Sequence, residues 1–141
     1  MARKRSQRQK TSRDVAGLLP RPEELLSFLE APVFARAWKA CALSDEDLFE
    51  LQQLILIDPK GHPAMTGTGG LRKIRFSPTD SPRGKSGSHR ACYVYYEEYG
   101  LVLLVTAYSK NEKDDLSAAA RKAIHKMIEE QTKLLARGPI R

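Results

Sequence analysis

Apolar positions in the first half of the chain follow one short strand and then recur at helical spacing. The short apolar segment Leu25–Glu30 predicts the strand. Pro32 suits the first turn of a helix, and Ser44 is a residue type that caps a second. The predicted inward positions of the two helices are Phe34, Ala37, Trp38 and Cys41, then Leu48, Leu51, Leu54 and Ile55. Asp58–Gly61 ends the second helix, so the pair forms an αα-hairpin.

The pattern then changes to the alternation and apolar runs that are typical of strands. Leu71–Ser77 alternates cationic and apolar residues, and Arg90–Glu97 is rich in aromatic and β-branched residues. Leu101–Ala107 is almost wholly apolar, which indicates a central buried strand. Ser117 is expected to cap a last helix, whose apolar side is Ala120, Ile124, Met127, Ile128, Leu134 and Leu135. The order βααβββα predicts an α+β domain with one small, largely antiparallel, twisted sheet.

Charge divides the chain more sharply than its net value of +7 suggests. Residues 1–13 carry six cations and no acids, whereas residues 14–59 carry three cations and nine acids. Residues 1–22 have no apolar periodicity and are predicted to be a basic, disordered arm. A domain is expected over residues 23–137, followed by a short tail, 138–141.

Cysteine usage and hydropathy narrow the class of protein. Cys41 and Cys92 lie among apolar residues and belong to no C-x-x-C pair, which favours two buried, reduced thiols. No apolar run approaches the length of about 18 residues that a transmembrane helix needs. We therefore expect a cytoplasmic protein that contacts no membrane, with no metal and no cofactor.

The positive charge of the predicted domain is concentrated between Gly67 and Arg90. Over residues 60–90 there are seven cations and one acid, Asp80. The period of a strand sends Lys73 and Arg75 to one face and the apolar residues between them to the other. Cations on a rigid strand suit a polyanion, above all a nucleic-acid backbone.

A nucleotide-binding P-loop is not indicated at either glycine-rich segment. The turn Gly67–Gly70 has no Gly-Lys-Ser/Thr after it at the required spacing. Gly84–Ser86 has the right residues, but Thr79 stands where the motif needs a glycine and no helix is predicted to follow. Both segments are therefore interpreted as loops.

Several motifs, taken in order, resemble the RelE/ParE superfamily of type II toxins. They are Gly-Thr-Gly-Gly-Leu-Arg-Lys-Ile-Arg from Gly67, Arg-Gly-Lys-Ser-Gly from Arg83, Tyr-Val-Tyr-Tyr from Tyr93 and Tyr-Ser-Lys-Asn-Glu from Tyr108. The resemblance covers roughly residues 25–135, and the most similar group is the HigB-like branch of RelE toxins. It implies an mRNA interferase that cleaves mRNA in the ribosomal A site without metal. It also implies a cognate antitoxin, usually a small DNA-binding protein.

The resemblance assigns roles to individual residues. In-line attack by a 2′-hydroxyl needs a base, an acid and cations at the phosphorane. Lys73 falls at the position of the base or phosphate clamp, with Arg75 beside it, and Arg90 would stabilise transition-state charge. Tyr108 and Lys110 follow at the end of the last strand, to stack on a base or donate a proton. The predicted RNA-binding residues are Arg72, Arg83 and Lys85.

The sequence departs from the RelE pattern in two places. Asn111 stands where an arginine often acts as the acid, and Leu116 occupies about the position of a late tyrosine. The resemblance therefore does not name the acid and the base, and Tyr108, Lys110 and Lys85 are the residues that can substitute.

Two other functions fit the same sequence. A ParE-like inhibitor of DNA gyrase would use the same fold through protein contacts. A non-catalytic RNA-binding module would use the arm and the basic strand. For Lys73 and Arg75, the alternative to any function is an ordinary solvated strand face.

Overall fold

The computed structural model describes residues 25–78, 88–112 and 115–138. The elements in these residues are β1 (Ser27–Glu30), α3 (Pro32–Ala40), α4 (Asp45–Ile57), β2 (Arg72–Phe76), β3 (His89–Tyr96), β4 (Leu101–Ser109) and α5 (Ala118–Arg137). A 3-10 helix, Glu97–Tyr99, joins β3 to β4. The predicted α+β class and βααβββα order are confirmed, with strand ends shifted by one or two residues. The predicted arm, residues 1–22, lies outside the described residues.

The four strands form one sheet in the order β1-β4-β3-β2. β1 runs parallel to β4, while the β2–β3 and β3–β4 pairs are antiparallel, so the sheet is largely antiparallel as predicted. β4 lies inside the sheet and is buried over Val102–Tyr108, which explains its apolar sequence. β2 is an edge strand and carries the cations that the sequence singled out.

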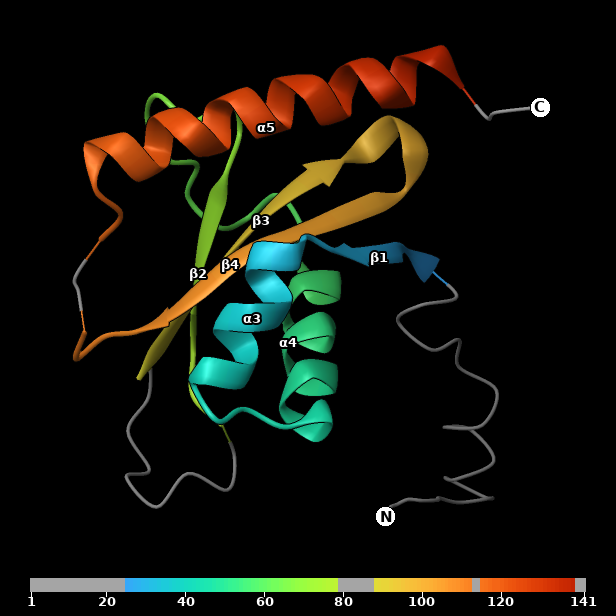
Figure 1. Ribbon diagram of the computed structural model, residues 1–141. Helices are drawn as coiled ribbons and strands as arrows, with labels where there is room; N and C mark the ends of the chain where they lie inside the picture. The colour runs from blue at the N-terminus through green and yellow to red at the C-terminus, as the bar shows by residue number, and fades with distance from the viewer. Residues whose placement is uncertain (1–24, 79–87, 113–114, 139–141) are drawn as a thin grey trace, which may run out of the picture.

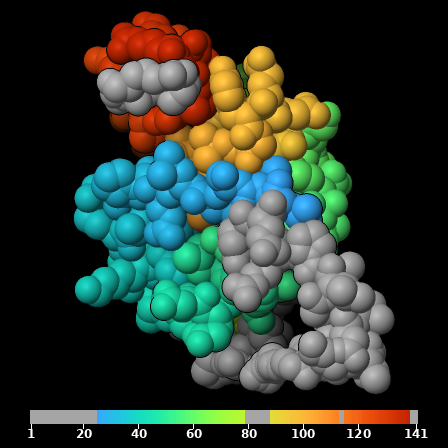
Figure 2. Space-filling view, turned by 90° about the vertical axis from the view of Figure 1, so that its right-hand side faces the viewer, coloured from blue at the N-terminus to red at the C-terminus, as the bar shows by residue number. Residues whose placement is uncertain are grey.

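The sheet separates α5 from the αα-hairpin, as Figures 1 and 2 show from two directions. On the hairpin side, the Trp38 ring stacks between Phe34 and Phe76, with centroids 5.3 and 5.7 Å away. On the α5 side, the Tyr96 hydroxyl donates to the Ile128 carbonyl at 3.4 Å. The molecule therefore has three layers, and each face of the sheet has its own helical cover.

The caps of α4 and α5 explain where these helices begin. Ser44 accepts a hydrogen bond from the Asp47 backbone N–H, and the Asp47 carboxylate accepts one from the Ser44 N–H, which completes a capping box. Ser117 caps α5 by accepting from the Ala120 N–H. Two predicted inward positions are wrong, because Leu54 and Leu134 are 40% and 54% exposed. The buried stripes end at Ile55 and Ile128, and these helices cover less of the core than predicted.

The glycine turn before β2 has a structural role. Gly67, Gly69 and Gly70 all have positive φ, which glycine adopts without strain. Between them, the buried Thr68 hydroxyl donates to the Met65 carbonyl and accepts from the Leu71 N–H. A side chain at Gly69 would meet the His125 ring, with a Cβ only 2.9 Å from its nearest carbon. The turn thus fixes where β2 starts and brings the chain against α5.

Candidate functional site

The alternation predicted for β2 is present and divides its side chains between two environments. Ile74 and Phe76 are buried, and Phe76 stacks on Trp38 beneath the αα-hairpin. Arg75 is exposed and Lys73 is half-buried on the other face of the strand. The two cations therefore share the face of the sheet that α5 partly covers.

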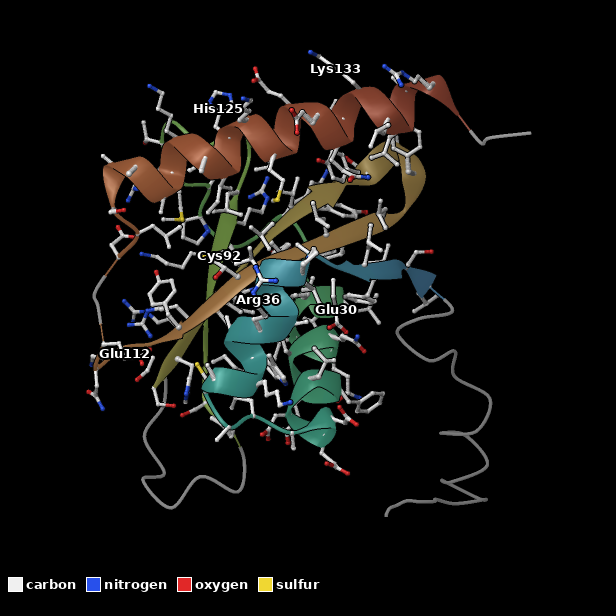
Figure 3. All side chains as sticks on the ribbon, in the orientation of Figure 1. Glu30, Arg36, Cys92, Glu112, His125 and Lys133 are labelled. Atoms are coloured by element: carbon white, nitrogen blue, oxygen red, sulfur yellow. The ribbon has the colours of Figure 1, made fainter. Side chains whose placement is uncertain are left out.

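The strand register brings Arg90 to the same face. Arg75 pairs with Arg90 across β2 and β3, and Arg90 pairs with Tyr108 across β3 and β4. Lys73 pairs with Cys92, two residues along β3, which Figure 3 labels in the sheet. Residues directly opposite in a sheet point to the same side, with Cβ atoms about 5 Å apart. Lys73, Arg75 and Arg90 thus form one cluster, called here the cation row.

One carboxylate contacts the cation row from the segment between β4 and α5. An Asp115 oxygen, Oδ1, lies 3.6 Å from Lys73 Nζ, and the other, Oδ2, lies 2.7 Å from an Arg121 guanidinium nitrogen. The Leu116 backbone N–H also donates to Oδ1, at 2.9 Å. Burial opposes the charged form of Asp115, but the Leu116 hydrogen bond, Lys73 and Arg121 together lower its pKa. Asp115 therefore lies between two cations, Lys73 of the cation row and Arg121 of α5.

Tyr108 lies in the sheet beside the cation row and is only 2% exposed. Burial raises the pKa of its hydroxyl, Cys92 and Asp115 raise it further, and Arg90 and Arg121 act in the opposite direction. A buried ring offers little surface for stacking on a base, and a raised pKa makes the hydroxyl a weaker acid. Tyr108 therefore stands as a buried neighbour of Arg90 on the next strand.

The remaining predicted residues divide into three groups. Lys110 is exposed just beyond β4, where its backbone N–H donates to the Ser88 carbonyl. Arg72 is separated from the row, because its guanidinium donates to the carbonyls of Lys60 and His62 at 2.9 and 2.7 Å. Arg83 and Lys85 lie outside the described residues. The structure therefore brings together Lys73, Arg75, Arg90 and Tyr108, with Lys110 past the end of the strand.

The two histidines near the basic stretch belong to the opposite face. His89 pairs with Phe76 in the β2–β3 register, and its Nδ1 lies 2.9 Å from the Ser88 hydroxyl. It lines a groove of about 890 Å³ between the α3–α4 turn and the end of β4, where Figure 3 labels Glu112. His62 packs edge-on against Tyr93, with ring centroids 6.2 Å apart. Neither ring faces the cation row.

Within residues 25–78, 88–112 and 115–138, no three His, Cys, Asp or Glu side chains gather as metal ligands would. No helix in these ranges is long and apolar enough to cross a membrane.

No protein-family model matches the chain. Two solved structures from E. coli are similar to it. One is a mutant of toxin RelE in the free state, with 17% identity and a TM-score of 0.41 over 62% of this chain and 85% of that chain. The other is the isolated RelE toxin, with 15% identity and a TM-score of 0.42 over 71% of this chain and 96% of that chain. Identities and TM-scores this low assign no activity, so a functional assignment depends on the residues of the site.

Sequence reasoning missed Asp115 and Arg121. Asp115 lies 42 positions after Lys73, and Arg121 is on a helix, whereas the candidate residues were chosen from the strands and the loops beside them. The available signal was weak: an acid just before the predicted cap Ser117, and a cation in the first turn of the following helix. First turns favour acids over cations, so Arg121 is a local exception that its ion pair explains.

Proposed function

We propose that the protein is a toxin of a type II toxin–antitoxin pair and cleaves mRNA on the ribosome without a metal ion. The cation row is the phosphate-binding part of this site. A cognate antitoxin, a small DNA-binding protein, would hold the toxin inactive. The ribosome as the place of action and the antitoxin as the partner are inferred from the motif resemblance to RelE toxins, among which the HigB-like branch is the most similar group. The structure supplies the support for the phosphate site.

The observation that carries the proposal is the direct pairing of Arg75 with Arg90. The β2–β3 register places the two arginines directly opposite each other on one face of the sheet, where both side chains can reach a single anion. Arginine is also the side chain best matched to phosphate, because its planar fork binds two oxygens at once. Lys73 adds a third cation on the same face. An RNA phosphate is the anion that this arrangement fits.

The chemistry assigns different tasks to the members of the site. Attack by a 2′-hydroxyl builds negative charge on a five-coordinate phosphorus, and fixed cations stabilise that charge more than they stabilise the substrate. Arg75 and Arg90 would hold the non-bridging oxygens. Lys73 already lies in an ion pair, so we assign it to holding the phosphate rather than to removing a proton. Lys110, exposed at the end of β4, is the described residue that remains for proton transfer.

The first experiment adds purified protein to translating ribosomes and maps mRNA ends by primer extension. We expect cleavage by the unaltered protein, and a fall of about 100-fold or more for Lys73→Ala with Arg75→Ala, because each lost donor weakens transition-state stabilisation. The double variant should also lose growth inhibition. Its circular dichroism and melting should stay those of a folded protein, because the altered side chains leave the buried face of β2 intact.

A matched control removes one arginine and one lysine elsewhere. Arg36 and Lys39 are exposed on α3, on the other side of the sheet, and Figure 3 labels Arg36. Arg36→Ala with Lys39→Ala should retain cleavage. Intact transcripts with the unaltered protein would refute the proposal. RNA binding without cleavage would then indicate an RNA-binding module, and loss of DNA supercoiling would indicate a gyrase inhibitor.

A further inference from the structure

The contacts of Asp115 show a carboxylate that is held in place independently of Lys73. Arg121 donates to its Oδ2 at 2.7 Å, and the Leu116 N–H donates to its Oδ1 at 2.9 Å. Arg121 is itself anchored, because its other terminal nitrogen donates to the Thr66 carbonyl at 3.3 Å. Leu116 is buried and fixes the backbone at that point. Asp115 is therefore held in its orientation by contacts on the α5 side that do not involve Lys73.

The weakest of these contacts is the one to the cation row. Lys73 Nζ lies 3.6 Å from Asp115 Oδ1, close enough for an ion pair but longer than a strong charge-assisted hydrogen bond. Both side chains keep contact with solvent, 27% exposed for Lys73 and 41% for Asp115. A charge pair of this kind contributes little free energy and exchanges readily with other ions. Lys73 can leave Asp115 while Asp115 stays on Arg121.

We propose that Asp115 is an internal competitor for the phosphate site: it occupies Lys73 in the free protein and gives Lys73 up when an RNA phosphate binds the cation row. This inference rests on the proposed function and adds a regulatory element to that site. Asp115 acts through Lys73, so it is a positioning residue. Asp115 keeps the Lys73 ammonium group in an ion pair, and it thereby lowers the net positive charge that an RNA phosphate encounters at the cation row.

The test uses binding of a short single-stranded RNA whose 2′-hydroxyls are methylated, so that cleavage cannot occur. Affinity is measured by fluorescence anisotropy over a range of salt concentrations. Asp115→Asn keeps the shape of the side chain and removes its charge. We expect binding to tighten by about two- to five-fold, the range that an exposed ion pair can contribute. The slope of log affinity against log salt should stay close to that of the unaltered protein, because Lys73 contacts the phosphate in both complexes.

Two controls separate release of Lys73 from a general change of charge. Glu97 forms a more exposed pair with Lys60, at 3.2 Å just after the end of β3, and Glu97→Gln removes the same charge there. It should leave affinity and slope unchanged. In a Lys73→Ala background, Asp115→Asn should no longer tighten binding. A merely structural role for Asp115 would not depend on Lys73 in this way.

The inference is overturned if Asp115→Asn fails to tighten binding, or tightens it equally without Lys73 or equally with Glu97→Gln. A second readout does not depend on RNA. Inorganic phosphate is titrated while NMR follows the Lys73 ammonium resonance, which should shift at lower phosphate in Asp115→Asn than in the unaltered protein. An unchanged titration also overturns it. Tighter binding in these assays together with intact transcripts on ribosomes would refute the proposed nuclease but not the role of Asp115.

Discussion

The Arg75–Arg90 pair places two like charges directly opposite each other on neighbouring strands, in the proposed phosphate site. Two guanidinium groups held opposite each other repel unless an anion lies between them. We predict that Arg75→Gln raises the free energy of unfolding by roughly 0.2–1 kcal/mol, the size of a cross-strand pair effect. The same variant should lose cleavage. Urea unfolding and the ribosome assay, run on one preparation, check both; a variant that is both less stable and fully active would contradict the assignment.

Tyr93 gives a prediction for alkaline pH. Burial raises its pKa from the ordinary 10.0 to about 12, with Arg72 lowering it and Asp58 raising it, and its hydroxyl donates to the Pro59 carbonyl at 2.7 Å. The folded state thus favours the neutral hydroxyl, so its contribution to stability is complete below pH 10 and is lost as pH rises toward 12. Tyr93→Phe removes this group.

The measurement for Tyr93 compares the two proteins by denaturant unfolding between pH 9 and 12. The stability advantage of the unaltered protein over Tyr93→Phe should shrink across pH 10–12, as follows from the shift of its pKa to about 12. Absorbance of ionised tyrosine should show one late-titrating group fewer in the variant. An advantage that stays constant over this range would show that burial does not control the ionisation of Tyr93.

At the scale of single residues, the sequence predicted those positions that follow from the two-residue period of a strand. Period 2 placed Lys73 and Arg75 on one face without any knowledge of the fold. The face of the sheet on which Arg90 lies could not be predicted in this way, because it depends on the register in which β2 and β3 align. Arg72 was assigned to RNA because it is a cation in the same run, whereas the structure uses it to bind two loop carbonyls. Asp115 and Arg121 depend on tertiary contacts that no spacing encodes.

At the scale of elements, α4 shows how much a cap contributes to the position of a helix. The capping box satisfies two backbone donors, Ser44 N–H and Asp47 N–H, that the first turn would otherwise leave to water. We predict that Ser44→Ala lowers the free energy of unfolding by about 1 kcal/mol. Thermal melting checks this, with Ser27→Ala as a control at an exposed serine in β1, which caps no helix. Equal melting temperatures for all three proteins would contradict the role of the cap.

Helix and strand identities were predictable because each combined a pattern with an end signal. α4 has Ser44 before it, and α5 has Ser117 before it and Gly138 at its end. The predicted apolar stripes were too wide, since Leu54 and Leu134 sit at plausible helical positions but beyond the reach of the sheet. The width of a buried stripe depends on what packs against the helix, and that is a property of the assembled layers.

At the scale of the whole molecule, residues 25–138 already contain a closed core between three layers. Phe34, Leu51, Tyr93 and Leu104 are all fully buried in it. We predict that deletion of residues 1–22 leaves cooperative thermal unfolding, because every buried residue of the described core lies later in the chain. Differential scanning calorimetry of the shortened chain checks this, and a broad transition without a defined midpoint would show that the arm belongs to the fold.

The segment just before β2 forms hydrogen bonds with the outer edge of this strand. The Lys73 N–H donates to the Pro63 carbonyl at 3.2 Å, the Met65 N–H donates to the Leu71 carbonyl at 2.7 Å, and Ala64 bridges Arg72. A strand that slides by one position turns every side chain over. For β2 such a slide would drive two cations into the core and push Ile74 and Phe76 into water. Loosening these hydrogen bonds would therefore remove the cations from the proposed phosphate site and expose the apolar face of β2 in one movement.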